Sequence, residues 1–166
     1  IKGGRVIDPA GKVDAALDIA LARGRIVAVR TNIAPGKAQL LDARGKLVVP
    51  GLIDIHTHAT VNSSSSAPMV RDGVTGWVET GWQGAETVTA GVVAVKAAPQ
   101  KAGLLLNIGR KGVMPGAGET MDLSLADVPA ARAAIAAHRD VVIGVKARLS
   151  RSITGDHDLE VLRRAQ

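Results

Sequence analysis

Beyond Gly51 the chain alternates short apolar runs with longer polar or Ala-rich segments, and this rhythm constrains the fold more than any other feature. Such alternation is typical of strand–helix units whose strands form a parallel sheet. It predicts strands at residues 52–58, 75–79, 104–108 and 141–147. It predicts helices at residues 67–72, 85–98 and 127–138, and a further helix from about residue 156. Asp127 is the expected N-cap of the third helix, with Pro129 in its first turn.

The first 50 residues follow a different pattern, in which short alternating segments are separated by glycines. This pattern predicts short antiparallel strands at residues 4–8, 16–21, 25–29, 39–42 and 46–49. Gly24 and Gly45 each stand between two of these runs, and glycine tolerates the positive φ that tight hairpins need. We therefore expect a small β-sandwich, or part of one, at residues 1–50 and a second domain at residues 51–166.

The composition narrows the classes of function. The chain has no cysteine, so a metal would need histidine, carboxylate or a less ordinary ligand. No stretch approaches the roughly 18 uncharged apolar residues of a membrane span, and no signal sequence opens the chain, so we expect a cytoplasmic protein without membrane contact. The 21 Lys and Arg are scattered among 15 acidic residues, with no Phe or Tyr to stack on a base, which argues against nucleic-acid binding.

Two histidines end the first predicted strand of the second domain. Alternate residues of a strand share a face, so Asp54, His56 and His58 are expected on one side. The pair lies at the carboxyl end of its strand, where α/β barrels place their functional residues. Neutral imidazole is the commonest metal-ligating side chain, which makes the pair a candidate metal site. The spacing alone is weak evidence and favours a structural or incidental pair over a metal site.

Lys146 ends the fourth predicted strand, among apolar residues. An ammonium group there is costly unless it is paired, neutralised or bound to a metal. One interpretation is that Lys146 pairs with a carboxylate such as Glu79, or extends its amine to solvent. Taken together with His56 and His58, a lysine at a neighbouring strand end favours a single metal centre.

Five segments resemble the amidohydrolase superfamily in order and spacing: residues 2–9, 24–29, 42–58, 73–75 and 144–148. The run at 42–58, DARGKLVVPGLIDIHTH, is the most specific of them. Residues 144–150, GVKARLS, are most similar to the dihydroorotase-like branch that includes the amidohydrolase/deacetylase proteins. The resemblance extends over nearly the whole chain.

The resemblance implies an α/β fold: a partial (β/α)8 TIM barrel, its first four βα units, preceded by a small β-sandwich segment. In that family the paired histidines bind metal, and a carboxylated lysine on the fourth strand bridges two divalent ions, usually zinc. A hydroxide between the ions attacks an amide or ester carbonyl. His56, His58 and Lys146 match these positions. Carboxylation would replace a buried cation with an anionic oxygen ligand.

The family's remaining ligands and its general base would lie beyond Gln166. The chain starts at Ile1 within strand-like sequence and stops within a helix-like pattern, so we expect it to be a piece of a longer protein. A complete barrel takes about 250 residues, which predicts a natural protein of roughly 350 to 450 residues. We expect a homo-oligomer when the protein is full length.

Other polar residues have weaker assignments. Asp54 is expected to orient one of the histidines as a hydrogen-bond acceptor, unless it is buried in another ion pair. Arg148 and Arg151 follow Lys146 and are candidates to bind a substrate carboxylate, although arginine is often simply solvated in such a loop. His138 is expected to complement the dipole of the helix that it ends, and His157 to lie on the surface. We assign no role to Glu119 or Lys111.

The sequence thus predicts a metal-dependent hydrolase that cleaves an amide or ester (C–N or C–O) bond of a small acylated or cyclic-amide substrate. Two alternatives remain open. One is a non-catalytic dihydroorotase-like scaffold, against which the intact His56, His58 and Lys146 argue. The other is a lyase or isomerase that uses the same binuclear site, because fold and ligands do not determine the reaction.

Overall fold

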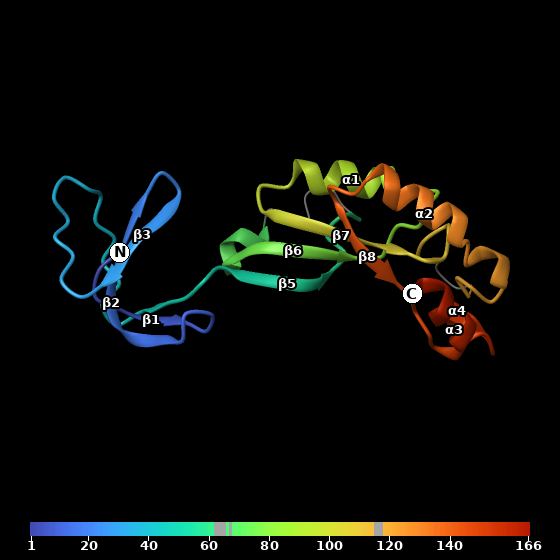
Figure 1. Cartoon of the computed structure of the whole chain (residues 1–166), viewed down its shortest axis with the longest axis horizontal. Helices are drawn as coiled ribbons and strands as arrows, with labels where there is room; N and C mark the ends of the chain where they lie inside the picture. Colours follow the sequence, from blue (N-terminus) through green and yellow to red (C-terminus); the bar gives the residue numbers. More distant parts are fainter. Residues whose placement is uncertain (62–65, 67, 115–117) are drawn as a thin grey trace. The chain divides into compact units, whose positions relative to one another are not determined.

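The computed structural model describes residues 1–61, 66, 68–114 and 118–166, which form two compact units, Ile1–Pro50 and Gly51–Gln166 (Figure 1). The segments at 61–66 and 109–120, which follow two of the predicted strands, lie partly outside these residues. None of the helices in the described ranges is long and apolar enough to span a membrane.

The first unit contains one four-stranded sheet in the order β3-β2-β1-β4. Its strands are β1 Gly4–Asp8, β2 Val13–Ala22, β3 Arg25–Arg30 and β4 Leu47–Val48. β2 pairs antiparallel with β1 and with β3. The hairpin between β2 and β3 turns at Arg23 and Gly24, with φ values of 50° and 72°. Two positive φ angles give a turn whose twist matches that of the strands, so the hairpin predicted at Gly24 is confirmed.

Two expectations for this unit are wrong. Residues 39–42 form no strand, and their only sheet contact among the described residues is a bridge between Lys2 and Asp42. The segment around Gly45 is a turn, in which the Lys46 amide donates to the Ala43 carbonyl at 2.9 Å, but it is not a hairpin. It leads into β4, which pairs parallel with β1 rather than antiparallel with a neighbour in sequence. A second layer, which a sandwich requires, stays a prediction.

Asp18 fastens the ends of several segments of the first unit. Its carboxylate accepts hydrogen bonds from Lys2 Nζ at 2.7 Å, the Gly3 amide at 3.0 Å and the Ile33 amide at 2.9 Å. The hydrogen bond from Lys2, followed by that from Gly3, lowers the pKa of Asp18 to about 2, against an opposing effect of burial. This side chain therefore holds the start of the chain and the segment after β3 onto β2.

The second unit is built on a parallel four-stranded sheet in the order β5-β6-β7-β8. Its strands are β5 Leu52–Thr57, β6 Val74–Thr80, β7 Lys101–Asn107 and β8 Val142–Lys146. The helices are α1 Val88–Ala97, α2 Val128–Ala137, α3 Arg151–Thr154 and α4 Asp158–Ala165, with the 3-10 helices η1 Pro68–Asp72 and η2 Leu123–Leu125. Each predicted strand is present, so the expected parallel α/β sheet is confirmed.

The predicted helices are present with shifted ends. The first of them, η1, is a 3-10 turn rather than an α-helix, and α1 starts three residues later than expected. Asp127 caps α2 as predicted, because its carboxylate accepts from the Ala130 amide at 3.0 Å. The short α3 was not expected from the sequence, since four residues are too few for a periodic pattern.

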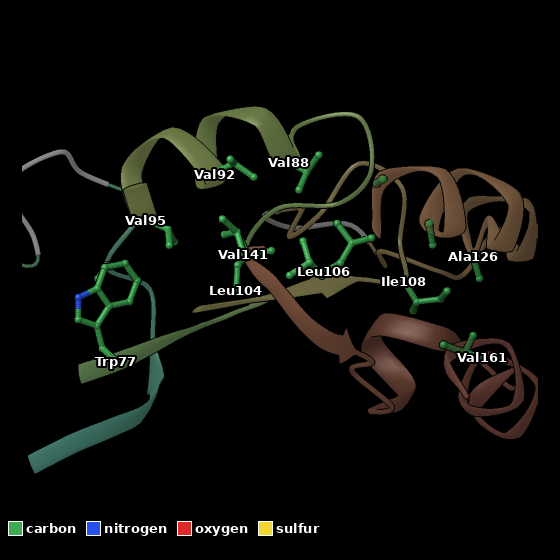
Figure 2. Packing of buried hydrophobic residues seen from close by; sticks show 14 residues of the cluster. Trp77, Val88, Val92, Val95, Leu104, Leu106, Ile108, Ala126, Val141 and Val161 are labelled. Carbon is green, nitrogen blue, oxygen red and sulfur yellow. The ribbon is translucent and has the colours of Figure 1, made fainter. Parts of the chain in front are cut away.

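The core of this unit lies between the sheet and the helices α1 and α2, which pack against β7 on one face of the sheet (Figure 1). Leu104 and Leu106 of β7 are fully buried there, and Trp77 of β6 extends the same cluster (Figure 2). Gly91 lets α1 approach closely, because a Cβ at this position would lie 2.6 Å from Leu104 Cδ1. The apolar face of β7 thus determines where α1 and α2 pack. The polar groups lie at the strand ends, outside this contact.

Adjacent valines on α1 test this packing. Val92 is 6% exposed and belongs to the core cluster, whereas Val93 is 63% exposed. We expect Val92→Ala to lower the free energy of unfolding by about 1.5–3 kcal/mol, because two buried methyl groups and their contacts are lost. Val93→Ala should change it by less than about 0.5 kcal/mol. Urea unfolding followed by tryptophan fluorescence measures both; equal losses would place the core elsewhere.

Asp18→Asn tests the anchor in the first unit. Because the folded-state pKa of about 2 lies below the reference of about 3.9 for a free aspartate, the stabilisation is present above about pH 4 and is lost as the pH falls toward 2. Hydrogen exchange should show that the Gly3 and Ile33 amides are better protected in the wild type than in the variant at about pH 5 to 6. This difference in protection should vanish near about pH 2. Asp14→Asn, which breaks an exposed pair with Arg5, is the control and should have little effect. A difference that persists at about pH 2 would contradict this account.

Candidate metal centre

The two candidate histidines lie at the carboxyl end of β5. His56 is in the strand, and His58 follows its last residue, Thr57. Pairing with β6 is irregular between Asp54 and Thr57, so the strict alternation of faces expected from the sequence is interrupted here. The two imidazole rings are nevertheless neighbours, with centroids 6.0 Å apart and planes at 85°.

Glu79, near the carboxyl end of β6, is a fully buried carboxylate beneath His58. Its Oε1 lies 2.8 Å from His58 Nδ1, at hydrogen-bond distance, and accepts from the Trp82 amide at 3.2 Å. Its Oε2 accepts from the hydroxyl of Thr60 at 2.7 Å and from the amide of Thr60 at 3.1 Å. The carboxylate therefore joins the segment after β5 to the segment after β6.

The side chains around this carboxylate continue the network. Gln83 Nε2 donates to the Thr60 hydroxyl at 2.8 Å, and Gln83 is itself buried. The indole of Trp82 meets the His58 ring edge to face, with centroids 5.4 Å apart. His58 is thus held by Glu79 on one side and by Trp82 on another, while 42% of its side chain stays exposed.

Asp54 contacts the backbone beside His56 rather than an imidazole. Its Oδ1 accepts from the His56 amide at 3.0 Å, and the residue is exposed. The acceptor that contacts a ring nitrogen is Glu79, for which the sequence analysis considered only a pairing with Lys146. A role of Asp54 in orienting a histidine stays a prediction.

Lys146 is the last residue of β8 and is half-buried. It pairs in register with Asn107 of β7, and its stem packs against the backbone of Gly81, where a side chain would collide with it. Within the described ranges, the Lys146 amine forms no ion pair, and Glu79 is occupied by other donors. Pairing with Glu79, one explanation considered for this lysine, is therefore not what the structure contains.

Arg148 is paired with Glu119, a residue to which the sequence analysis assigned no role. Arg148 Nη1 donates to Glu119 Oε1, and the other oxygen of Glu119 accepts from Asn107 Nδ2 at 2.9 Å. Glu119 is 2% exposed. It lies in a glycine-rich loop without apolar periodicity, so the sequence offered no signal of its burial. Arg151 pairs with Asp156 at 3.2 Å on the surface.

The other two histidines lie away from the strand ends discussed above. His138 is the C-cap residue of α2, ahead of β8, and so belongs to the amino end of that strand. His157 is exposed at the N-cap of α4. Neither has a contact with His56 or His58 among the described residues.

The histidine pair fits part of a metal site. With Nδ1 of His58 bonded to a carboxylate, its Nε2 is the nitrogen left to bind an ion. In the described part of the chain, no three His, Cys, Asp or Glu side chains converge. β5 and β8 are the two outer strands of the sheet, about 14 Å apart along three flat strand spacings. A centre that includes Lys146 therefore needs the sheet to curve, and ligands beyond the pair.

Comparison with known proteins supports the resemblance. No family model matches the chain. A dihydroorotase of Geotalea daltonii is 51% identical over 59 residues, which cover 35% of this chain and 14% of that protein. A dihydroorotase of Solibacter usitatus is 40% identical over 73 residues, or 44% of this chain and 17% of that protein.

Two solved structures share the fold. A crystal structure of an adenine deaminase has a TM-score of 0.70 at 26% identity, covering 90% of this chain and 42% of that one. A crystal structure of a dihydroorotase has a TM-score of 0.79 at 21% identity, covering 99% of this chain and 46% of that one. The chain therefore spans less than half the length of either structure. These sequence matches and the shared fold support the resemblance of this chain to dihydroorotase-like proteins of the amidohydrolase superfamily.

Proposed function

We propose that the protein to which this chain belongs is a metal-dependent hydrolase acting on an amide or ester bond of a small acylated or cyclic-amide substrate. The observation that carries the proposal is the pair His56 and His58 at a strand end, with the Nδ1 of His58 bonded to a buried carboxylate. An imidazole held in this way presents its other nitrogen as a ligand. The sequence matches to proteins named dihydroorotases support this class of activity.

The proposed architecture is a (β/α)8 barrel of which β5 to β8 are the first four strands, preceded by a sandwich domain at residues 1–50. Support comes from the parallel order of the strands and from the likeness to a dihydroorotase over 99% of the chain. In such a barrel the carboxyl ends of the strands form the catalytic face. His58, Glu79, Asn107 and Lys146 all lie at or next to those ends.

His56 and His58 are proposed to hold one divalent ion through imidazole nitrogens, and Lys146, once carboxylated, to bridge it to a second. Bound zinc ions would lower the pKa of a water toward neutrality and polarise the scissile carbonyl. The chain's own contribution is to orient His58 through Glu79 and to offer the Lys146 amine at the same edge of the sheet. Asp54 steadies the backbone at His56.

Arg148 is the stronger of the two candidates for binding an anionic group of the substrate. Its guanidinium is fixed at one nitrogen by buried Glu119, and 40% of the side chain is exposed. The arginine is thus oriented while other N–H groups remain available. The negative charge of Glu119 partly compensates the positive charge of Arg148. The reduced net charge favours a substrate with a single negative charge, or a polar amide, over a multiply charged anion. Arg151, 85% exposed and paired with Asp156, is far less constrained.

Loss of either histidine should remove metal. We expect full-length His56→Ala and His58→Ala proteins to retain less than half the metal of the wild type after dialysis, because one of few ligands is gone. The same preparations should lose turnover of whichever substrate is found among cyclic amides, acyl amides, acyl esters and aminopurines. The aminopurines are included because one structural neighbour is an adenine deaminase.

His138→Ala is the matched control for these variants. It removes an imidazole at the C-cap of α2, ahead of the amino end of β8, and should leave the metal content unchanged. Full metal occupancy in both the His56 and His58 variants would refute the assignment and leave a scaffold as the better reading. Metal without hydrolysis in the wild type would favour a lyase or isomerase.

Carboxylation of Lys146 can be detected without knowing the substrate. Full-length protein equilibrated with ¹³C-bicarbonate and zinc should give a carbamate carbon signal by NMR, which Lys146→Ala abolishes. The variant should also lose activity that short carboxylic acids partly restore, since they supply the missing oxygen ligands. Lys111→Ala removes an exposed lysine and should keep the carbamate signal. A wild-type protein with full metal content and no carbamate would disprove this modification.

A further inference from the structure

We propose that Glu79 is the positioning residue of the metal centre: it fixes the Nδ1–H tautomer and the orientation of His58, and so presents Nε2 to the ion. The inference rests on the proposed function, because it takes His58 to be a ligand. It assigns a role to Glu79, which among the described residues is the one fully buried carboxylate in contact with a candidate histidine.

The hydrogen bonds of Glu79 are those of a carboxylate that only accepts. An ionised carboxylate has about four acceptor positions and no donor. Three donors occupy three of them, the Trp82 amide on Oε1 and the amide and hydroxyl of Thr60 on Oε2, and His58 Nδ1 lies 2.8 Å from Oε1 at the fourth. Two of these donors are backbone N–H groups, which cannot reverse their polarity. Glu79 is thus held as an acceptor facing Nδ1 of His58.

An acceptor at Nδ1 determines the chemistry of the opposite nitrogen. A neutral imidazole carries a single N–H, so a proton bonded to Glu79 from Nδ1 leaves Nε2 with its lone pair. The Nδ1 edge is turned toward a carboxylate that is 0% exposed, whereas 42% of the His58 side chain is exposed. The nitrogen free to bind a metal therefore belongs to the accessible part of the ring.

The support behind Glu79 limits its movement. Gln83, which is buried, donates from Nε2 to the Thr60 hydroxyl at 2.8 Å, and that hydroxyl donates to Glu79 Oε2. Trp82 contributes its amide to the carboxylate and its indole to the face of His58. One side of the ring thus meets Glu79, near the end of β6, and another meets Trp82, which follows β6. His56, by contrast, has no side-chain hydrogen bond within the described ranges, so only one of the two histidines is oriented in advance.

A purely structural role for Glu79 is the competing explanation, since the carboxylate also ties Thr60 and Trp82 together. The two roles differ in what they predict for the imidazole proton. If Glu79 only joins loops, its replacement by an isosteric amide destabilises the protein but leaves His58 and the ion unaffected. If it positions His58, the tautomer and the metal affinity change together.

The first measurement needs no variant. Two-bond ¹H–¹⁵N correlation spectra of metal-free, full-length wild-type protein at about pH 8.5, well above the reference pKa of about 6.5 for an imidazole, report which ring nitrogen is protonated. We expect the Nδ1–H form at His58, identified by loss of its signals in His58→Ala. An Nε2–H form would overturn the proposal, even if Glu79 variants fail to fold.

The second measurement compares variants by zinc affinity in a chelator competition. Glu79→Gln should bind zinc about 10- to 100-fold more weakly, the usual cost of losing such a support, and should shift the tautomer balance toward Nε2–H. Glu79→Asp, which keeps both acceptor oxygens and the negative charge, should recover part of the loss. Glu119→Gln removes another buried carboxylate, bonded to Arg148 rather than to a histidine, and should leave zinc affinity within about twofold.

The outcomes separate this inference from the proposed function. If His58→Ala keeps its zinc, the metal assignment fails, whatever Glu79 does. If His58→Ala loses zinc while Glu79→Gln binds it as the wild type does, the metal centre stands and the positioning role is refuted. Equal losses in Glu79→Gln and Glu119→Gln would also refute it, because they would trace the effect to a general loss of stability.

Discussion

The parallel alignment of β5 to β8 is the constraint on which the rest of the second unit depends. Four strands that run the same way end at one edge of the sheet, and each contributes a polar group there: His58, Glu79, Asn107 and Lys146. The helices cover one face and pack on β7, so the apolar burial is completed away from that edge. Stability and candidate chemistry are in this way assigned to different parts of the same strands.

Buried polar groups at that edge are acceptable only because they are hydrogen-bonded. An unpaired buried carboxylate or amide would lower the free energy of unfolding by roughly several kcal/mol, which is a large part of the total stability of a domain. Glu79 accepts from three donors, and its Oε1 lies 2.8 Å from His58 Nδ1. Asn107 bonds both Gly81 and Glu119 while accepting from the Gly109 amide. These bonds hold the loops after β5, β6 and β7 against one another. The edge is therefore organised by polar contacts before any ligand is considered.

The sequence predicted what depends on local periodicity and missed what depends on tertiary contact. The alternation of short apolar runs with longer segments located β5 to β8, and a capping aspartate located the start of α2. Alternation does not encode the direction of a partner, so the parallel pairing of β4 with β1 was missed. Glu119 lies in a glycine-rich loop and becomes buried only through Arg148 and Asn107, contacts that no local pattern reveals.

The charges at the strand ends link the proposed role of Lys146 to the proposed role of Glu79. Glu79 is the carboxylate that the sequence suggested as a partner of Lys146, but its acceptor positions face His58, Thr60 and Trp82. Glu119 is likewise engaged by Arg148. A half-buried amine without an ion-pair partner in the described ranges is a cost that an exposed lysine would avoid. On the proposed chemistry, carboxylation turns that cost into an anionic ligand, while Glu79 stays free to hold the imidazole. Because Glu79 is bonded to His58, it does not neutralise Lys146, and carboxylation is the proposed way in which the charge of Lys146 is removed.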